Sequence, residues 1–222
     1  MLVPFLPYVL VSLLQLVALA AGAATLAAAS KWLLMPALGL ALVLAAPRTR
    51  RARRVVGPAA AGILFSWLGD VLLGTPGGLG FLLGLGAFLL AHVSYLVLFA
   101  RGLRTRPVPV WAVVLVPWWV ALLVVLGPHL GALFVPVAVY GLVLGGSAAL
   151  ALATNRFSAV GALLFLASDT VLALKLFLPG FALWQADAVI MLLYLLGEGL
   201  IVFGAVRSPD SERSPSPVPQ TG

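Results

Sequence analysis

The chain has 222 residues, of which 63% are hydrophobic and 9% are charged; its net charge is +7 and it has no cysteine. Soluble domains are about half apolar and about a quarter charged, so this composition excludes a water-soluble globule. The mean hydropathy of +1.18 indicates instead a polytopic membrane protein. The lack of cysteine excludes disulfides and thiolate chemistry, and two histidines are too few for a three-histidine zinc site, so no metal is expected.

The apolar runs predict an all-α bundle, because a membrane-spanning helix needs roughly 20 mainly apolar residues. Eight such spans are predicted, at residues 4–29, 31–46, 56–74, 78–100, 108–126, 130–153, 158–178 and 183–206. The first span is not interpreted as a signal peptide, because no basic segment precedes it. Residues 1–206 are therefore expected to form one transmembrane domain. Residues 207–222 are rich in serine and proline, and we expect them to be a disordered cytoplasmic tail.

The positions of the basic residues predict the orientation in the membrane. With eight spans, all the arginines fall on one side, and only Lys31 and Lys175 fall on the other. Since cytoplasmic loops carry the excess of lysine and arginine, both termini are expected to be cytoplasmic, in a plasma membrane of bacterial type. The arginine clusters are interpreted as this topology signal, facing anionic lipid, so no nucleic-acid partner is expected.

Four acidic residues lie in the predicted spans or at their edges: Asp70, Asp169, Asp187 and Glu198. An ionisable group in the bilayer costs about 3 kcal/mol or more, so each is a candidate functional residue. The alternative is a structural ion pair or an interfacial position, which fits Asp187 best. Asp70 and Asp169 each follow a glycine by eight residues, on spans that run in the same direction. This similarity suggests a possible parallel four-helix internal duplication, with chance as the alternative.

Other polar residues are predicted to line one cavity together with Asp70 and Asp169. Those from the spans are Ser66, His92, Tyr95, Asp187, Tyr194 and Glu198. The last three share one stripe of the final span. A helical rise of about 1.5 Å per residue places His92 and Glu198 about 10 Å below the two aspartates, as a lower layer of the cavity. For His92, an interhelical hydrogen bond is an equally good interpretation.

The two lysines are expected at the outer ends of spans. Lys31 opens the second predicted span, and Lys175 lies near the end of the seventh. One interpretation is that both side chains snorkel to the membrane surface. The functional interpretation is that they bind the phosphate of a lipid at the mouth of the cavity.

Five short segments occur in an order and spacing that a known family also shows. They are KWLLMP from Lys31, FSWLGD from Phe65, AFLLAHVSY from Ala87, Ser168-Asp169, and YLLGEGLI from Tyr194. From about residue 30 to residue 203, the chain resembles the YhhN-type lysoplasmalogenase family of eight-span membrane proteins. Two positions depart from the family pattern. Trp32 stands where members often have proline, and Glu198 stands where they often have glutamine.

The resemblance implies an ether hydrolase. Its substrate would be a lysophospholipid, a lysoplasmalogen with a choline or ethanolamine headgroup, taken from the lipid bilayer. Cleavage of the vinyl ether bond would release a fatty aldehyde and a glycerophospho-alcohol, with no cofactor. The family's two motif aspartates, proposed as catalytic, correspond to Asp70 and Asp169.

Two carboxyl groups suit this reaction. One protonated carboxyl would protonate the alkenyl carbon, and a carboxylate would stabilise the oxocarbenium ion or activate water, as in glycoside hydrolysis. Two neighbouring acids in a low dielectric do not both ionise easily, so their roles separate. We therefore expect Asp70 and Asp169 in one cavity, roughly 5–9 Å apart. The residues alone also allow a proton-coupled transporter, which should have access from both sides, or a non-catalytic lipid-binding protein.

Overall fold

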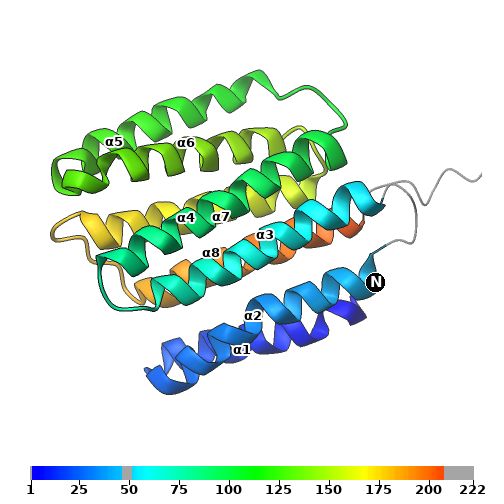
Figure 1. The fold of residues 1–222 in the computed structure, drawn as a ribbon, viewed down its shortest axis with the longest axis horizontal. Helices are drawn as coiled ribbons and strands as arrows, with labels where there is room; N and C mark the ends of the chain where they lie inside the picture. Colours follow the sequence, from blue (N-terminus) through cyan, green and yellow to red (C-terminus); the bar gives the residue numbers. More distant parts are fainter. Residues whose placement is uncertain (1, 47–51, 208–222) are drawn as a thin grey trace, which may run out of the picture.

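The computed structural model describes residues 2–46 and 52–207, which form helices joined by short turns, with no strand in these two ranges. The described residues contain eight α-helices: α1 (Leu6–Ala20), α2 (Ala24–Ala45), α3 (Ala52–Leu73), α4 (Gly78–Val97), α5 (Leu115–Leu130), α6 (Phe134–Ala151), α7 (Arg156–Phe177) and α8 (Ala186–Val206) (Figure 1). Short helical segments extend several of them: η1 (Val3–Phe5), η2 (Leu98–Leu103), η3 (Val110–Val114) and η4 (Gly131–Leu133). The predicted tail beyond Arg207 lies outside the described residues.

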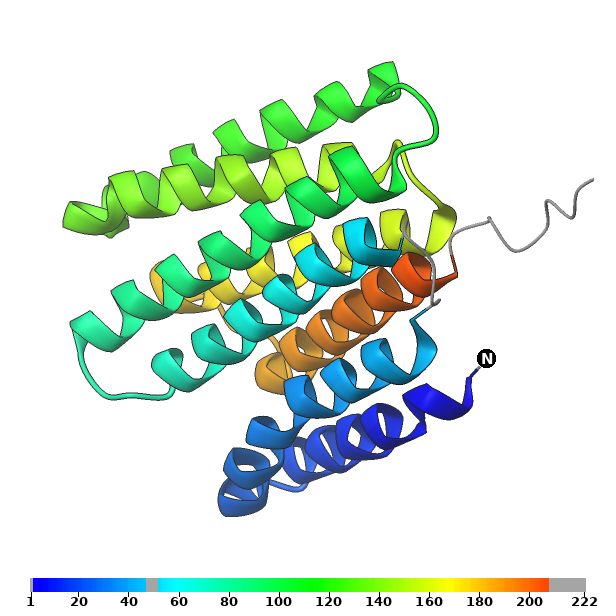
Figure 2. The same cartoon turned by 45° about the vertical axis from the view of Figure 1, so that its right-hand side comes forward.

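The described helices include seven runs that are long and apolar enough to cross a membrane, one fewer than the eight predicted spans. The difference arises in the run Val110–Ala151, which has 42 residues and contains both α5 and α6. A straight helix of that length would be roughly 63 Å long, about twice the apolar core of a bilayer. The chain instead turns back at Gly131, where φ is +51°, and α5 and α6 lie antiparallel (Figure 2). The protein is therefore an all-α integral membrane bundle.

The first turn does not lie where the sequence predicted it. We expected a break near residue 30, whereas the chain turns between α1 and α2 at Gly22, which has a φ of +68°. The prediction was wrong because the alanines on both sides keep the hydropathy high through the turn, so no polar residue marks it. As a result, Lys31 lies seven residues inside α2, about 10 Å from the start of this helix.

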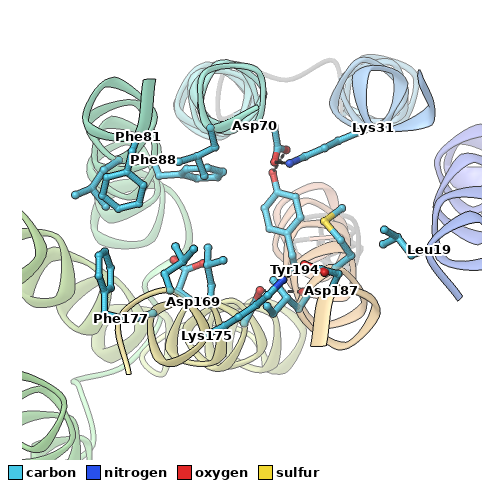
Figure 3. A pocket seen from close by; sticks show the side chains of 18 of the residues that line it. Leu19, Lys31, Asp70, Phe81, Phe88, Asp169, Lys175, Phe177, Asp187 and Tyr194 are labelled. Carbon is cyan, nitrogen blue, oxygen red and sulfur yellow. Dashed lines mark hydrogen bonds and ion pairs between the residues drawn. The ribbon is translucent and has the colours of Figure 1, made fainter. Parts of the chain in front are cut away.

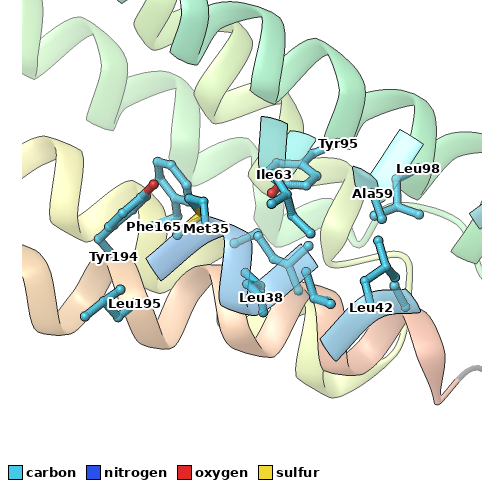
Figure 4. Packing of buried hydrophobic residues seen from close by; sticks show 14 of the residues in the cluster. Met35, Leu38, Leu42, Ala59, Ile63, Tyr95, Leu98, Phe165, Tyr194 and Leu195 are labelled. Atoms are coloured by element: carbon cyan, nitrogen blue, oxygen red, sulfur yellow. The ribbon is translucent and has the colours of Figure 1, made fainter. Parts of the chain in front are cut away.

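The described arginines gather at one end of the bundle, which we call the arginine end. Arg54 and Arg156 lie at the starts of α3 and α7, and Arg207 directly follows α8 (Figure 1). Near this end, the helices are tightly packed by buried side chains such as Leu42 and Leu98 (Figure 4). The solid core therefore occupies this part of the bundle, and the cavity described below lies in the other half.

Helices α7 and α8 approach each other closely along small residues. A Cβ atom added to Gly161 would lie 2.7 Å from the carbonyl oxygen of Gly197 and 2.8 Å from the backbone nitrogen of Ile201. Small residues permit such contact, and close packing is a main force between helices in lipid. On α3, the glycine at the corresponding place, Gly62, lies against the ring of Tyr95 of α4. This parallel is compatible with an internal duplication, which stays a prediction.

The close approach at Gly161 yields a test of the packing. Gly161→Ala is expected to destabilise the protein by about 1–3 kcal/mol, because the added methyl group meets backbone atoms that cannot move aside. Gly86→Ala is the matched control, since nothing lies within 4 Å of the methyl group there. Thermal unfolding in detergent should give a lower midpoint for Gly161→Ala alone. Equal midpoints for the two variants would contradict this account of the α7–α8 contact.

Candidate active site

A cavity of about 460 Å³ lies in the half of the bundle away from the arginine end (Figure 3). Its ionisable lining residues are Lys31, Asp70, Asp169, Lys175 and Asp187. Its neutral polar ones are Gln15, Tyr140, Ser168 and Tyr194. Much of the remaining wall is apolar and includes Phe81, Leu85, Phe88, Val137 and Phe177. The cavity therefore combines an apolar wall with several charged side chains that come from different helices.

Asp70 is held by contacts from two other helices. Its Oδ1 atom lies 3.1 Å from Nζ of Lys31 on α2, and its Oδ2 atom accepts a hydrogen bond of 2.8 Å from the hydroxyl of Tyr194 on α8. Only 7% of the Asp70 side chain is exposed. Because a buried carboxylate needs a paired charge and hydrogen bonds, these contacts suit an ionised Asp70. The sequence had suggested that Lys31 lies at the end of a span and is free to bind a phosphate at the mouth of the cavity. Instead, Lys31 lies within α2 and pairs with Asp70.

Asp169 has a different environment. It projects from α7 and accepts a hydrogen bond from the hydroxyl of Tyr140 on α6. Within the described part of the chain, no lysine or arginine forms an ion pair with it. The two carboxyl groups thus share one cavity but differ in partners. Asp70 contacts a cation and a phenol, whereas Asp169 contacts a phenol only.

Four of the predicted cavity residues do not line the cavity. Glu198 is fully buried below it, where Ser66 donates a hydrogen bond of 2.6 Å to Oε1 and Tyr95 donates one to Oε2. His92 is also buried, and neither of its ring nitrogens has a hydrogen-bond partner among the described residues. The prediction that these residues form a lower layer of the cavity was therefore wrong. These groups form a separate cluster, which we call the buried polar cluster.

An aromatic layer separates the cavity from the buried polar cluster. The ring of Phe165 is fully buried, with its centroid 5.2 Å from that of Tyr194 and 4.5 Å from that of His92. Phe88 packs against both Phe165 and Tyr194, at centroid distances of 6.3 Å and 6.1 Å. The rise along a helix places a residue at a depth, but it does not reveal which rings fill the space between two depths. This is why the sequence merged two layers into one.

Lys175 and Asp187 lie at the rim of the cavity. Lys175 is in the last turn of α7 and Asp187 in the first turn of α8. Their side chains form an ion pair with Nζ and Oδ1 2.5 Å apart. The exposed fractions of the two side chains are 36% and 68%. Both residues therefore meet the surroundings of the protein as well as the cavity.

Three polar lining residues were missed by the sequence interpretation. Gln15 accepts a hydrogen bond of 2.5 Å from Ser30, and Ser168 donates one of 2.9 Å to the carbonyl oxygen of Ile190. Tyr140, the partner of Asp169, is the most important omission. Each of the three is a polar side chain in a largely apolar span, a position that usually faces the interior of the bundle. That signal was present, but it did not identify their partners.

Comparison with known proteins confirms the family resemblance seen in the sequence. Residues 26–205 match the YhhN family. Two curated proteins named lysoplasmalogenase, from Mycobacterium bovis and Mycobacterium tuberculosis, are each 38% identical to the chain over 140 residues. The match covers 59% of this chain and 52% of each relative, so the chain spans about half the length of the curated relatives it matches. No solved structure matches the chain significantly.

Proposed function

We propose that this chain, which belongs to the YhhN family, is a membrane ether hydrolase that cleaves the vinyl ether bond of a lysoplasmalogen. The products are a fatty aldehyde and a glycerophospho-alcohol. The proposal rests on one observation. Asp70 and Asp169 both line a single cavity, and each has its own hydrogen-bonding partners. The name of the two mycobacterial relatives supports the same class of substrate.

The lining of the cavity fits a lipid with one chain. The apolar wall, which includes Phe81, Phe88 and Phe177, suits the alkenyl chain. The charged rim suits the polar end of the molecule. This placement brings the vinyl ether, which joins the two parts of the lipid, beside Asp70 and Asp169. A volume of about 460 Å³ is in the range of cavities that hold small ligands, and the substrate enters from the bilayer in which it is dissolved.

The different partners of the two aspartates assign their roles. Lys31 and Tyr194 stabilise a negative charge on Asp70, so Asp70 acts as the carboxylate. Asp169 has no cation beside it in the described chain, so the protonated form avoids the cost of an unpaired charge. Asp169 is therefore the general acid. It donates its proton to the alkenyl carbon, and the carbon attached to the ether oxygen becomes an oxocarbenium ion.

Water completes the reaction. The Asp70 carboxylate stabilises the cation and accepts a proton from the attacking water, which forms a hemiacetal. The hemiacetal hydroxyl then returns a proton to Asp169, the bond to the glycerol oxygen breaks, and this oxygen takes the proton held by Asp70. Both aspartates recover their starting forms. One water molecule is consumed, and no electron is transferred to or from the protein.

The packing below the cavity suits a hydrolase that opens on one side. A transporter that works by alternating access also needs a second route to its site, from the arginine end, in another of its conformations. In the described structure, Tyr95, Phe165 and Glu198 occupy that direction and are fully buried. A closed floor suits an enzyme that both admits its substrate and releases its products at the lipid-facing side.

The proposal is tested with purified protein in detergent. The substrates are lysoplasmenylethanolamine and two lysolipids with the same headgroup and chain length, one with an acyl and one with a saturated alkyl linkage. We expect aldehyde from the vinyl ether lipid only. Release of fatty acid from the acyl lipid would indicate a lysophospholipase instead. Binding of the vinyl ether lipid without aldehyde formation would indicate a lipid-binding protein.

The hydroxyl of Tyr140 provides a finer test of the role of Asp169. Tyr140→Phe is expected to lower kcat about tenfold with little change in KM, because the hydrogen bond orients the acid rather than the lipid. Tyr8→Phe is the matched control, since the hydroxyl of Tyr8 donates to the carbonyl oxygen of Leu195 away from the cavity. Steady-state kinetics of both variants check this. Equal kcat values for Tyr140→Phe and Tyr8→Phe would show that Tyr140 takes no part in the mechanism.

A further inference from the structure

The ion pair at the cavity rim, Lys175 with Asp187, takes no part in the chemical steps above. We infer that it is a headgroup site for a zwitterionic lysophospholipid, in which Lys175 binds the phosphate and Asp187 binds the positively charged amine. This inference rests on the proposed function, because it assumes that a lysolipid occupies the cavity. Its new element is Asp187, which makes the site selective for a headgroup that carries a cation.

The position of the pair matches the layout of the substrate. Both residues line the same cavity as Asp169, and their side chains point toward each other at its edge (Figure 3). Lys175 follows Asp169 by six residues on α7, which is about 9 Å of helical rise. A lysolipid has its glycerol unit between the ether oxygen and the phosphate. With the vinyl ether at Asp169, the phosphate therefore extends toward Lys175.

A ligand can separate the ion pair of Lys175 and Asp187 at little cost in stability. An exposed ion pair contributes little to stability, and both side chains are well exposed. Each charge is also favoured by its own helix, because Asp187 lies in the first turn of α8 and Lys175 in the last turn of α7. A molecule with one negative and one positive group can therefore replace both partners at once.

Lys175 is the better of the two cavity lysines for the phosphate. Lys31 already forms an ion pair with the buried Asp70, with Nζ and Oδ1 3.1 Å apart. The ammonium group of Lys175 has three donors that suit phosphate oxygens, while the Asp187 carboxylate accepts from an ethanolamine ammonium or pairs with a choline. A lipid that ends in a phosphate monoester brings no cation. Its binding leaves Asp187 unpaired beside added negative charge, which disfavours it.

Substitution of Asp187 tests the selectivity. In the wild type, kcat/KM should be higher for lysoplasmenylethanolamine than for the vinyl ether lysolipid that ends in a phosphate monoester. Asp187→Asn is expected to reduce this preference about fivefold, and Asp187→Glu should retain it. The change should appear in KM rather than in kcat, because the headgroup lies outside the reacting bond. An unchanged preference in Asp187→Asn would overturn the inference.

A charge exchange separates recognition from simple helix pairing. The double variant Lys175→Asp, Asp187→Lys keeps an ion pair between α7 and α8 but reverses its direction. We expect the protein to stay folded, with a thermal midpoint slightly below that of the wild type because each exchanged charge opposes its helix dipole, while the headgroup preference falls. A pair that only joins the two helices would leave the preference of the double variant at the wild-type value. That result would overturn the headgroup site.

Binding without turnover distinguishes this inference from the proposed function. The probes are two saturated 1-alkyl lysolipids, one with phosphoethanolamine and one with a phosphate monoester, titrated into the purified wild type by calorimetry. Stronger binding of the phosphoethanolamine lipid supports the headgroup site, even if no vinyl ether is hydrolysed. Equal binding of both lipids overturns the headgroup site, even if aldehyde is released.

Discussion

Asp169→Asn is expected to lower kcat for aldehyde release by about 10³-fold, while the protein inserts and folds as the wild type does. Asparagine has the shape of aspartate and still accepts a hydrogen bond from Tyr140, but it has no acidic proton to give to the alkenyl carbon. Asp70→Asn is expected to cause a comparable loss for another reason, because it removes the negative charge that stabilises the cation. Aldehyde release per mole of purified, monodisperse protein is the measurement.

A carboxyl group of the buried polar cluster provides the matched control for both aspartates. Glu198→Gln also exchanges a buried acid for its amide, but Glu198 does not line the cavity. The amide oxygen still accepts a hydrogen bond from Ser66. We expect aldehyde release to stay near the wild-type rate in this variant. Full activity in Asp70→Asn or in Asp169→Asn would contradict the two-carboxylate mechanism.

Lys31→Met is expected to reduce kcat about 100-fold with little change in KM. The sequence had suggested a phosphate-binding lysine, whose loss would raise KM instead. The observed ion pair of 3.1 Å with Asp70 predicts a different result, since removing Lys31 leaves a buried carboxylate without its cation. The carboxylate then tends to take up a proton and no longer stabilises the positive charge. Michaelis–Menten kinetics distinguish the two outcomes.

Two further variants sharpen the test of Lys31. Lys31→Arg keeps a positive charge beside Asp70 and should recover part of kcat. The double variant Lys31→Met, Asp70→Asn should be no slower than Asp70→Asn alone, because both substitutions disable the same carboxylate. Independent, multiplicative losses would show that Lys31 acts apart from Asp70. A rise in KM with unchanged kcat would return Lys31 to phosphate binding.

The sequence predicted part of the cavity lining, but not the contacts of these residues. Charge is so rare in this chain that each intramembrane acid was a candidate, and Asp70, Asp169 and Tyr194 do line one cavity. Their partners could not be predicted, because Lys31 and Tyr140 lie on helices whose relative rotation depends on packing throughout the bundle. Spacing along a helix identifies neighbours on one face, but it carries no information about the face opposite.

The errors in the fold have related causes. Hydropathy detects the ends of a span by polar residues, and the turn at Gly22 has none, so the first two predicted spans shared a wrong boundary. This boundary placed Lys31 at a membrane surface. The sequence placed the polar residues in two layers of one cavity, but the ring of Phe165 between Tyr194 and His92 separates them into a cavity and a closed cluster. Both errors moved a charged or polar residue to the wrong environment.

The most direct test of the account is the mass of the aldehyde that the wild-type protein forms in deuterium oxide. Protonation of the alkenyl carbon by a carboxyl group that exchanges with solvent predicts one deuterium on the carbon next to the carbonyl group. Preformed aldehyde, incubated with the protein under the same conditions, controls for later exchange. An aldehyde released without deuterium would contradict proton transfer to the vinyl ether, and with it the role assigned to Asp169.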